Sequence, residues 1–216
     1  LSPKIAKVSL NGSFDGDFGT NGIAVYEDYL LSNQVTSVSY DQQNNKILVV
    51  TGKAIQTSGG TIYKINPIGV VESERQFSFG NGLAPLSSAD NDTSGNLYVF
   101  GNFNDEKPVS LKFNSAGNQD NSYQLMTNFS WTWTPRYYLN RSDGSSFILT
   151  SKYAKPTILK RTPNGIIDTS FGTNGIVTLN YLYDGDTSLK MNVYNGNKII
   201  LTGITTPTTG NREVFL

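Results

Sequence analysis

The sequence contains no cysteine and no histidine among its 216 residues. The chain therefore has no thiol nucleophile, no disulfide, no imidazole base and no zinc site of the usual cysteine–histidine type. Its 17 basic and 17 acidic residues cancel, so no positive excess favours nucleic acid or anionic lipid as a partner. These absences exclude a large part of enzyme chemistry and argue against nucleic-acid binding.

Long apolar runs are also missing. The longest, such as Ile47–Val50, have the length of a strand, far below the ~18 to 20 consecutive apolar residues of a membrane helix. We therefore expect no membrane insertion. The chain is instead rich in glycine, with 21 residues, and 37% of it is hydrophobic and 12% aromatic. This composition is typical of short strands that are joined by frequent turns around a buried core.

The chain repeats itself. The hexapeptide FGTNGI occurs at Phe18–Ile23 and again at Phe171–Ile176. Weaker copies lie between them, as FGNGL at Phe79–Leu83 and as Asp120 followed by Tyr123. A turn glycine precedes each copy, and an acidic residue follows that glycine three positions later. The glycines are Gly12, Gly69, Gly117 and Gly165, and the acidic residues are Asp15, Glu72, Asp120 and Asp168.

A second marker, a turn followed by an apolar strand, repeats in phase with the first. These strands begin about fifty residues apart, at Ile47, Leu97, Phe147 and Ile199. The apolar segments are of strand length, and none has helical spacing over more than about two turns. Four strands fit the first repeat, at 23–26, 35–40, 46–53 and 61–66. A four-stranded meander every ~40 to 50 residues predicts the blades of a β-propeller.

The repeat phase predicts an all-β chain of β-propeller blades, with four four-stranded antiparallel meanders and one extra N-terminal outer strand. Residues 1–10 would be the outer strand of a preceding blade, and the blades would span 11–66, 67–113, 114–161 and 162–216. One strand is too many for a closed four-bladed ring, so we favour part of a larger ring of roughly six to eight blades. A compact four-bladed unit is the alternative.

An open arc of blades would leave two blade faces uncovered, and stacking against neighbours is what stabilises repeat proteins. We therefore expect the remainder of the polypeptide or a protein partner to cover these faces.

The pattern of glycine, acidic residue, Ser-Phe-Gly-x-x-Gly and KILV-type strand resembles the delta-60 repeat of large bacterial secreted and cell-surface proteins. The resemblance runs from about Lys7 to Leu216. The third repeat lacks the Phe-Gly pair, and the second has extra residues before its FGNGL. The resemblance implies an adhesin-like or secreted protein, outside the cell or on its surface, that an export system carries as cargo. Our leading hypothesis is therefore a non-enzymatic binding or scaffold module without a cofactor, which presents loops to a glycan or a protein partner.

The recurring acidic residue has a structural and a chemical interpretation. It could serve as a metal ligand or general acid, but an Asp at the head of a turn also accepts a backbone N–H bond from two residues on. We favour the structural role, and a similar one for the FGTNGI glycines, which suit positive φ angles. The aromatic residue of each copy would fill the space between blades. These residues are Phe18, Phe79, Tyr123 and Phe171.

Two DGD turns, at Asp15/Asp17 and Asp184/Asp186, resemble the start of a calcium loop. Neither has the further spaced oxygens or the closing Glu of such a loop. We interpret them as solvated turns and predict no metal site.

Function is best sought where the copies differ, because residues common to every repeat usually build the scaffold. The largest difference is an aromatic segment of the third repeat, which we take as the candidate ligand-binding site. Its residues are Trp131, Trp133, Arg136, Tyr137 and Tyr138. In a strand both indoles would lie on one face, as a platform for a sugar ring or another apolar surface. The alternative is that these rings fill a gap between blades.

An enzyme with its site in the central channel of the propeller is the second hypothesis. Without histidine it would need Asp, Glu, Tyr or Lys chemistry, or a metal. No such residues converge in the sequence, so we assign no catalytic residue.

Overall fold

A computed structural model describes residues 4–26, 33–53, 60–77, 86–103, 107–123, 134–152, 155–179, 187–194, 198–205 and 213–215. Within these ranges every regular element is a β-strand, which confirms the all-β prediction. None of the described residues forms a helix with the length and hydropathy needed to span a membrane.

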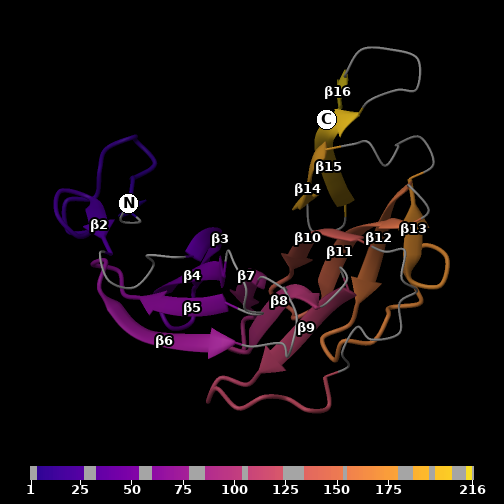
Figure 1. Cartoon of the computed structure of the whole chain (residues 1–216), viewed down its shortest axis with the longest axis horizontal. Helices are drawn as coiled ribbons and strands as arrows, with labels where there is room; N and C mark the ends of the chain where they lie inside the picture. The colour runs from indigo at the N-terminus through magenta and orange to yellow at the C-terminus, as the bar shows by residue number, and fades with distance from the viewer. Residues whose placement is uncertain are drawn as a thin grey trace. The chain divides into compact units, whose positions relative to one another are not determined.

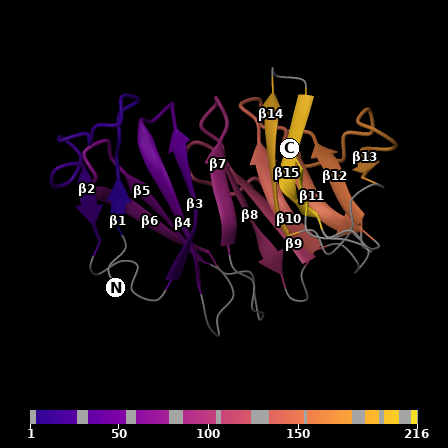
Figure 2. The same cartoon turned by 90° about the horizontal axis from the view of Figure 1, so that it is seen from above.

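The strands follow one another in short antiparallel meanders (Figures 1 and 2). They are β1 (Lys4–Ala6), β2 (Ile23–Val25), β3 (Asn33–Asp41), β4 (Lys46–Lys53), β5 (Gly60–Ile65), β6 (Val71–Phe77), β7 (Leu86–Asn91), β8 (Leu97–Phe103), β9 (Lys107–Phe113), β10 (Thr134–Asn140), β11 (Ser146–Lys152), β12 (Lys155–Arg161), β13 (Ile176–Thr178), β14 (Thr187–Tyr194), β15 (Lys198–Thr205) and β16 (Glu213–Phe215). The sheets have the orders β1-β2, β3-β4-β5-β6, β7-β8-β9, β10-β11-β12-β13 and β14-β15-β16.

The chain divides into two compact units. The first is Leu1–Asn104 together with Phe113–Asn118, and the second is Asp105–Lys112 together with Gln119–Leu216. Each unit has one complete four-stranded meander, β3–β6 in the first and β10–β13 in the second.

The sheet boundaries differ from the predicted ones by one strand. The strand at 23–26 was expected to open the first blade, but Ile23–Val25 pairs with Lys4–Ala6 instead. In the same way β6 and β13 pair back onto β5 and β12. The complete sheets therefore run over 33–77 and 134–178, and not over 11–66 and 114–161. The N-terminal sheet has two strands instead of the one predicted.

The turn glycine explains this shift. In the first unit Asn66 N donates to Val70 O at 2.9 Å, and Gly69 N donates to Asn66 O at 3.0 Å, which closes a tight hairpin. The glycines of these turns have φ angles that favour glycine over other residues. Their φ values are +89° at Gly12, +89° at Gly69, +85° at Gly117 and +80° at Gly165. Because the turn reverses the chain at once, the strand after it joins the same sheet as the strand before it.

Each unit has its own hydrophobic core. In the first unit, Phe18 and Tyr26 from the N-terminal sheet and its turn pack against Val49 and Tyr63 of β4 and β5. In the second unit, Phe147 and Leu149 of β11 pack with Met191 of β14.

Phe18 and Tyr123, two of the aromatic residues predicted to fill the space between blades, are buried, whereas Phe171 is half-buried. Phe18 is 0% exposed and Tyr123 is 4% exposed. The ring of Phe171 packs edge-on against Phe147, with centroids 5.5 Å apart. Phe79 lies outside the described residues.

Candidate functional site

The recurring acidic residue is held by its own turn and by a lysine. Asp168 Oδ2 lies 2.6 Å from Lys160 Nζ, and Asp168 Oδ1 accepts a hydrogen bond from Ser170 N at 3.1 Å. The Lys160 ammonium, followed by the Ser170 hydroxyl, lowers the pKa of Asp168 to about 2. The carboxylate is therefore ionised at neutral pH, and both of its oxygens are engaged.

The first and third copies share this geometry. Asp15 lies 2.8 Å from Lys7 Nζ, and Asp120 lies 3.5 Å from Lys112 Nζ. Asp15 accepts from the backbone N–H two residues on, at Asp17, and Asp120 does the same at Ser122. A hydrogen bond from Lys7 lowers the pKa of Asp15, and one from the Ser122 hydroxyl lowers that of Asp120. The structural interpretation is confirmed for these copies.

The second copy departs from the pattern. Glu72 lies within β6, and its carboxylate pairs with Lys46 Nζ of β4 at 2.6 Å. This ion pair links two strands of one sheet instead of closing a turn. In this copy the acidic side chain thus makes a cross-strand contact.

The FGTNGI segment has the same backbone in both copies. The φ angles are +58° and +85° at Gly19 and Gly22, and +56° and +87° at Gly172 and Gly175. A Cβ placed on Gly19 would lie 2.2 Å from the carbonyl oxygen of Ile23. Glycine is thus required for backbone reasons, as the sequence predicted.

The predicted aromatic site is described only in part. Trp131 and Trp133 lie outside the described residues, and Arg136 is placed only as backbone in β10. The neighbours Tyr137 and Tyr138 face opposite sides of the sheet, because successive residues of a strand alternate. Tyr137 packs with Phe147 and Leu149, whereas Tyr138 packs against Ile148 and Leu159. The two tyrosines therefore do not share one platform. The ligand-binding role of the segment stays a prediction.

A buried arginine was missed by the sequence analysis. Arg161 of β12 is 1% exposed, and its Nε and Nη2 donate to Gly165 O at 2.8 and 2.6 Å. Its Nη1 donates to the hydroxyl of Ser110, and its guanidinium lies 4.9 Å from the ring centroid of Tyr123. Burial lowers the pKa of Arg161. The repeat alignment could have indicated it, because a charged residue, Arg161, stands at the position where the first repeat has the apolar Ile65.

Arg161 is one of three side chains that donate a hydrogen bond to the carbonyl oxygen of a turn glycine. Tyr26 Oη donates to Gly69 O at 2.9 Å, and Arg75 Nη1 donates to Gly117 O at 2.7 Å. Each of these carbonyls thus has a long polar side chain as its donor. We infer that Arg161 holds a turn in place.

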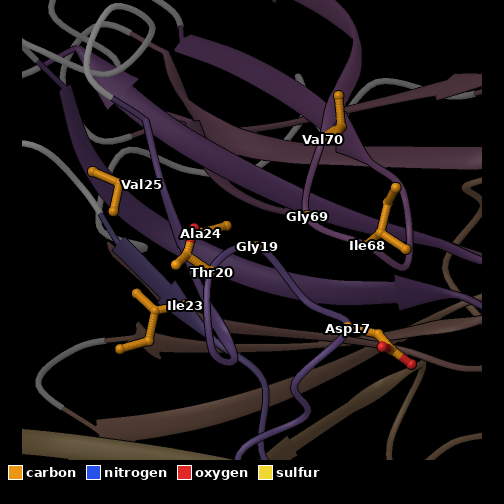
Figure 3. Close-up of a pocket in the computed structure, with 9 residues that line it drawn as sticks. All are labelled: Asp17, Gly19, Thr20, Ile23, Ala24, Val25, Ile68, Gly69 and Val70. Carbon is orange, nitrogen blue, oxygen red and sulfur yellow. The ribbon is translucent and has the colours of Figure 1, made fainter.

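An open hollow lies in the first unit (Figure 3). Its volume is about 670 Å³, and its wall combines the FGTNGI turn, β2 and the turn before β6. Val25, Ile68 and Val70 line it, and each is about half exposed. Asp17 is the ionisable group among the lining residues. Such a wall suits binding of an apolar surface with one hydrogen-bond donor, and it provides no acid–base pair.

Two carboxylates of the first unit, Asp41 and Asp90, influence each other electrostatically. Burial, together with the charge of Asp41, raises the pKa of Asp90 in β7. Asp41, at the end of β3, is fully buried and accepts from Asn44 N at 3.1 Å and Asn44 Nδ2 at 2.8 Å. In the part of the chain that the structure describes, no group of three or more acidic, His or Cys side chains could hold a metal ion. The DGD turn at Asp184/Asp186 lies outside that part.

Comparison with known proteins shows the fold. No protein-family model matches the chain, and no curated protein matches it. The structure of the Dos1 propeller is 7% identical with a TM-score of 0.57, over 94% of this chain and 48% of that one. A structure of prolyl endopeptidases is 12% identical with a TM-score of 0.48, over 85% and 26%. A putative hydrolase from Bacteroides ovatus is 11% identical with a TM-score of 0.48, over 85% and 56%.

The first of these likenesses identifies the sheets as β-propeller blades. The chain spans about half the length of the Dos1 propeller structure and about a quarter of the prolyl endopeptidase structure.

Proposed function

We propose that the chain is a non-enzymatic binding and scaffold module of a secreted or surface-displayed bacterial protein. In this role its propeller blades present loops to a glycan or a protein partner. The placement outside the cell and the link to an export system rest on the resemblance to the delta-60 repeat. Fractionation of the source bacterium with an antibody to the chain tests them, and a wholly cytoplasmic signal would contradict both.

One observation carries the proposal that the module is a scaffold. The acidic residues that recur in the repeats are the obvious candidates for chemistry, yet Asp15, Asp120 and Asp168 are held in turns and ion pairs. Their pKa values are lowered, whereas a carboxylic acid that donates a proton near neutral pH needs a raised one. These residues are therefore suited to holding loops in place.

Binding is assigned to the features that differ among repeats. The aromatic segment with Trp131, Trp133 and Arg136 is one candidate surface, because indole rings stack on the apolar faces of sugars. The hollow beside Val25 and Ile68 is the second, because its exposed apolar wall suits a ring or an aliphatic group. Both are consistent with a glycan or peptide ligand.

A glycan array followed by calorimetry of each ligand found tests the binding role. We expect Trp131→Ala and Trp133→Ala each to weaken a glycan ligand about two- to tenfold, since stacking on one aromatic ring is worth about 0.5–1.5 kcal/mol beyond the area it buries. Tyr194→Ala is the matched control, because Tyr194 is an exposed aromatic residue outside the segment. Unchanged affinity for every ligand in both Trp variants would exclude the aromatic platform.

An enzyme remains the second candidate because of Asp90. Burial and the charge of Asp41, at the end of β3, raise the pKa of Asp90 in β7. A raised carboxyl pKa of this kind is found in acid–base catalysts. A panel of glycoside and ester substrates with Asp90→Asn as the comparison separates the two functions. Turnover that Asp90→Asn abolishes would contradict the non-enzymatic proposal, and we expect no turnover by either protein.

A further inference from the structure

The first strand of the first complete sheet exposes an apolar strip. Val35, Val38 and Tyr40 of β3 are 47%, 56% and 53% exposed. Their partners across β4 are Thr51, Val49 and Ile47, which alternate along that strand and therefore share one face. A bulge between Val35 and Ser37 keeps Val35 on the same face as the other two. We call these three residues the β3 strip.

The β3 strip continues a face that is buried elsewhere in the sheet. Val49, Tyr63 and Ile65 of β4 and β5 pack against Phe18 and Tyr26 from the N-terminal sheet and its turn. No residue of β3 belongs to this cluster of described residues. The two-stranded sheet β1–β2 therefore covers the middle of the larger sheet and leaves its first strand open.

The second unit shows what covers the same repeat positions. When the two apolar strands are aligned at Ile47 and Ile199, the partner of Val49 on β3 is Val38, and the partner of Leu201 on β14 is Met191. Met191 is thus the counterpart of Val38, but it is only 2% exposed. It packs in a cluster with Phe147 and Leu149 of β11, and Tyr137 and Leu139 of β10 contact that cluster. The first two strands of the preceding sheet bury it.

Among the described strands β1 pairs with β2 alone, so the N-terminal sheet offers a position for two further strands. The repeat KIAKVSLNG aligns with TILKRTPNG, so β1 is the counterpart of β12. In the complete sheet β12 has β13 on one side and β11 on the other. β1 has β2 as its partner on the side that corresponds to β13. A hairpin that corresponds to β10–β11 would therefore pair with the opposite edge of β1 and lie over the β3 strip.

We propose that the edge of β1 and the β3 strip together bind a two-stranded antiparallel β-hairpin, supplied by a further repeat of the same polypeptide. The hairpin pairs with β1 through backbone hydrogen bonds, and its alternating apolar residues cover Val35, Val38 and Tyr40. In such strand addition the backbone hydrogen bonds to the sheet edge provide affinity, and the contacts of the apolar side chains provide specificity. The site goes beyond the proposed binding role, because it completes the scaffold whatever the loops bind.

A grafted hairpin tests the proposal. A copy of residues 134–154, which carries β10 and β11, is placed directly before Ser2, because Lys155 and Ser2 align in the repeat. We expect hydrogen exchange of the β1 amides to slow by about tenfold or more, since exchange then requires opening of a complete sheet. We also expect the thermal unfolding midpoint to rise.

Two matched variants separate docking from mere extension of the chain. A graft with lysine at the copied Leu139 and Leu149 positions places charge on the face that would meet the β3 strip, and should lose the protection. Val38→Lys should do the same in the grafted chain. In the chain without the graft it should change little, because Val38 is already exposed.

A synthetic peptide of residues 134–152, added to the ungrafted chain, gives a second measurement if the graft disturbs folding. The proposal is wrong if neither the graft nor the peptide protects the β1 amides. It is also wrong in its choice of occupant if the ungrafted chain self-associates in sedimentation and Val38→Lys abolishes that association, since a second copy would then fill the site.

Discussion

Lys160 and Asp168 are joined twice, through the backbone and through their side chains. Asp168 N donates to Lys160 O at 2.9 Å, and Lys160 Nζ lies 2.6 Å from Asp168 Oδ2. Two other copies of the repeat have the same double link. Their backbone bonds are Asp15 N to Lys7 O at 2.9 Å and Asp120 N to Lys112 O at 2.8 Å. In these three copies the pair thus fixes the segment after the turn glycine to the strand before it.

The Lys160–Asp168 pair predicts a loss of stability in acid. The pKa of Asp168 is about 2 in the folded protein, against an ordinary value of 3.8. Because the folded value is the lower one, its stabilisation is present above about pH 4 and is lost as the pH falls to about 2. Urea unfolding between pH 5 and pH 2 should show this decrease. Asp168→Asn should show a smaller decrease, and an unchanged pH profile in that variant would contradict the assignment.

Gly19→Ala should destabilise the first unit. Gly19 has φ +58°, and a Cβ there would lie 2.2 Å from Ile23 O. We expect the free energy of unfolding to fall by about 1–3 kcal/mol, which is the range for backbone strain of this kind. Gly16→Ala is the control in the same loop, because no heavy atom lies within 4 Å of its Cβ position. Equal effects of the two substitutions in chemical denaturation would argue against the steric explanation.

The hydroxyl of Tyr26 should matter more than that of Tyr40. Tyr26 Oη donates to Gly69 O in a buried position, whereas the bond from Tyr40 Oη to Asn45 Oδ1 is exposed. We expect Tyr26→Phe to cost about 1–3 kcal/mol, since it leaves a buried carbonyl without its donor, and Tyr40→Phe to cost less than about 0.5 kcal/mol. Thermal and urea unfolding of the pair measure the difference. A smaller loss in Tyr26→Phe than in Tyr40→Phe would show that the Gly69 contact does not stabilise the turn.

Arg161→Ile places in the third repeat the residue type that Ile65 provides in the first. Despite this agreement with the repeat pattern, we expect a loss of about 1–3 kcal/mol, because Gly165 O loses the donors Nε and Nη2. Arg161→Lys keeps the charge but not the forked geometry, and should recover only part of the loss. Full stability of Arg161→Lys would mean that the charge alone matters.

The repeat was readable from the sequence because its markers are local. A glycine at positive φ, an Asp that binds the N–H two residues on, and an apolar strand of seven or eight residues each depend on a few neighbouring residues. The grouping of strands into sheets was wrong by one strand, because the marker falls inside a hairpin. Sequence similarity gives the length of a period but not which strand begins a sheet.

The roles of single side chains were harder to predict. Tyr137 and Tyr138 formed one aromatic segment in the sequence, but strand alternation sends them to two different clusters. Arg161 occupies a position that is apolar in other repeats, and its partners Ser110 and Tyr123 are distant in sequence. Such contacts depend on the packing of sheets against each other, which no local pattern encodes.

The sequence by itself determined the repeat length, the all-β character and the turn positions, because these follow from interactions within about ten residues. Only the tertiary structure decided which copies of a repeated residue are buried. Val38 and Met191 occupy the same position of the repeat, but one is 56% and the other 2% exposed. The difference arises because a side chain is buried by the sheet that lies opposite it. Met191 packs against β10 and β11 of a four-stranded sheet, whereas Val38 lies beyond the two-stranded sheet β1–β2.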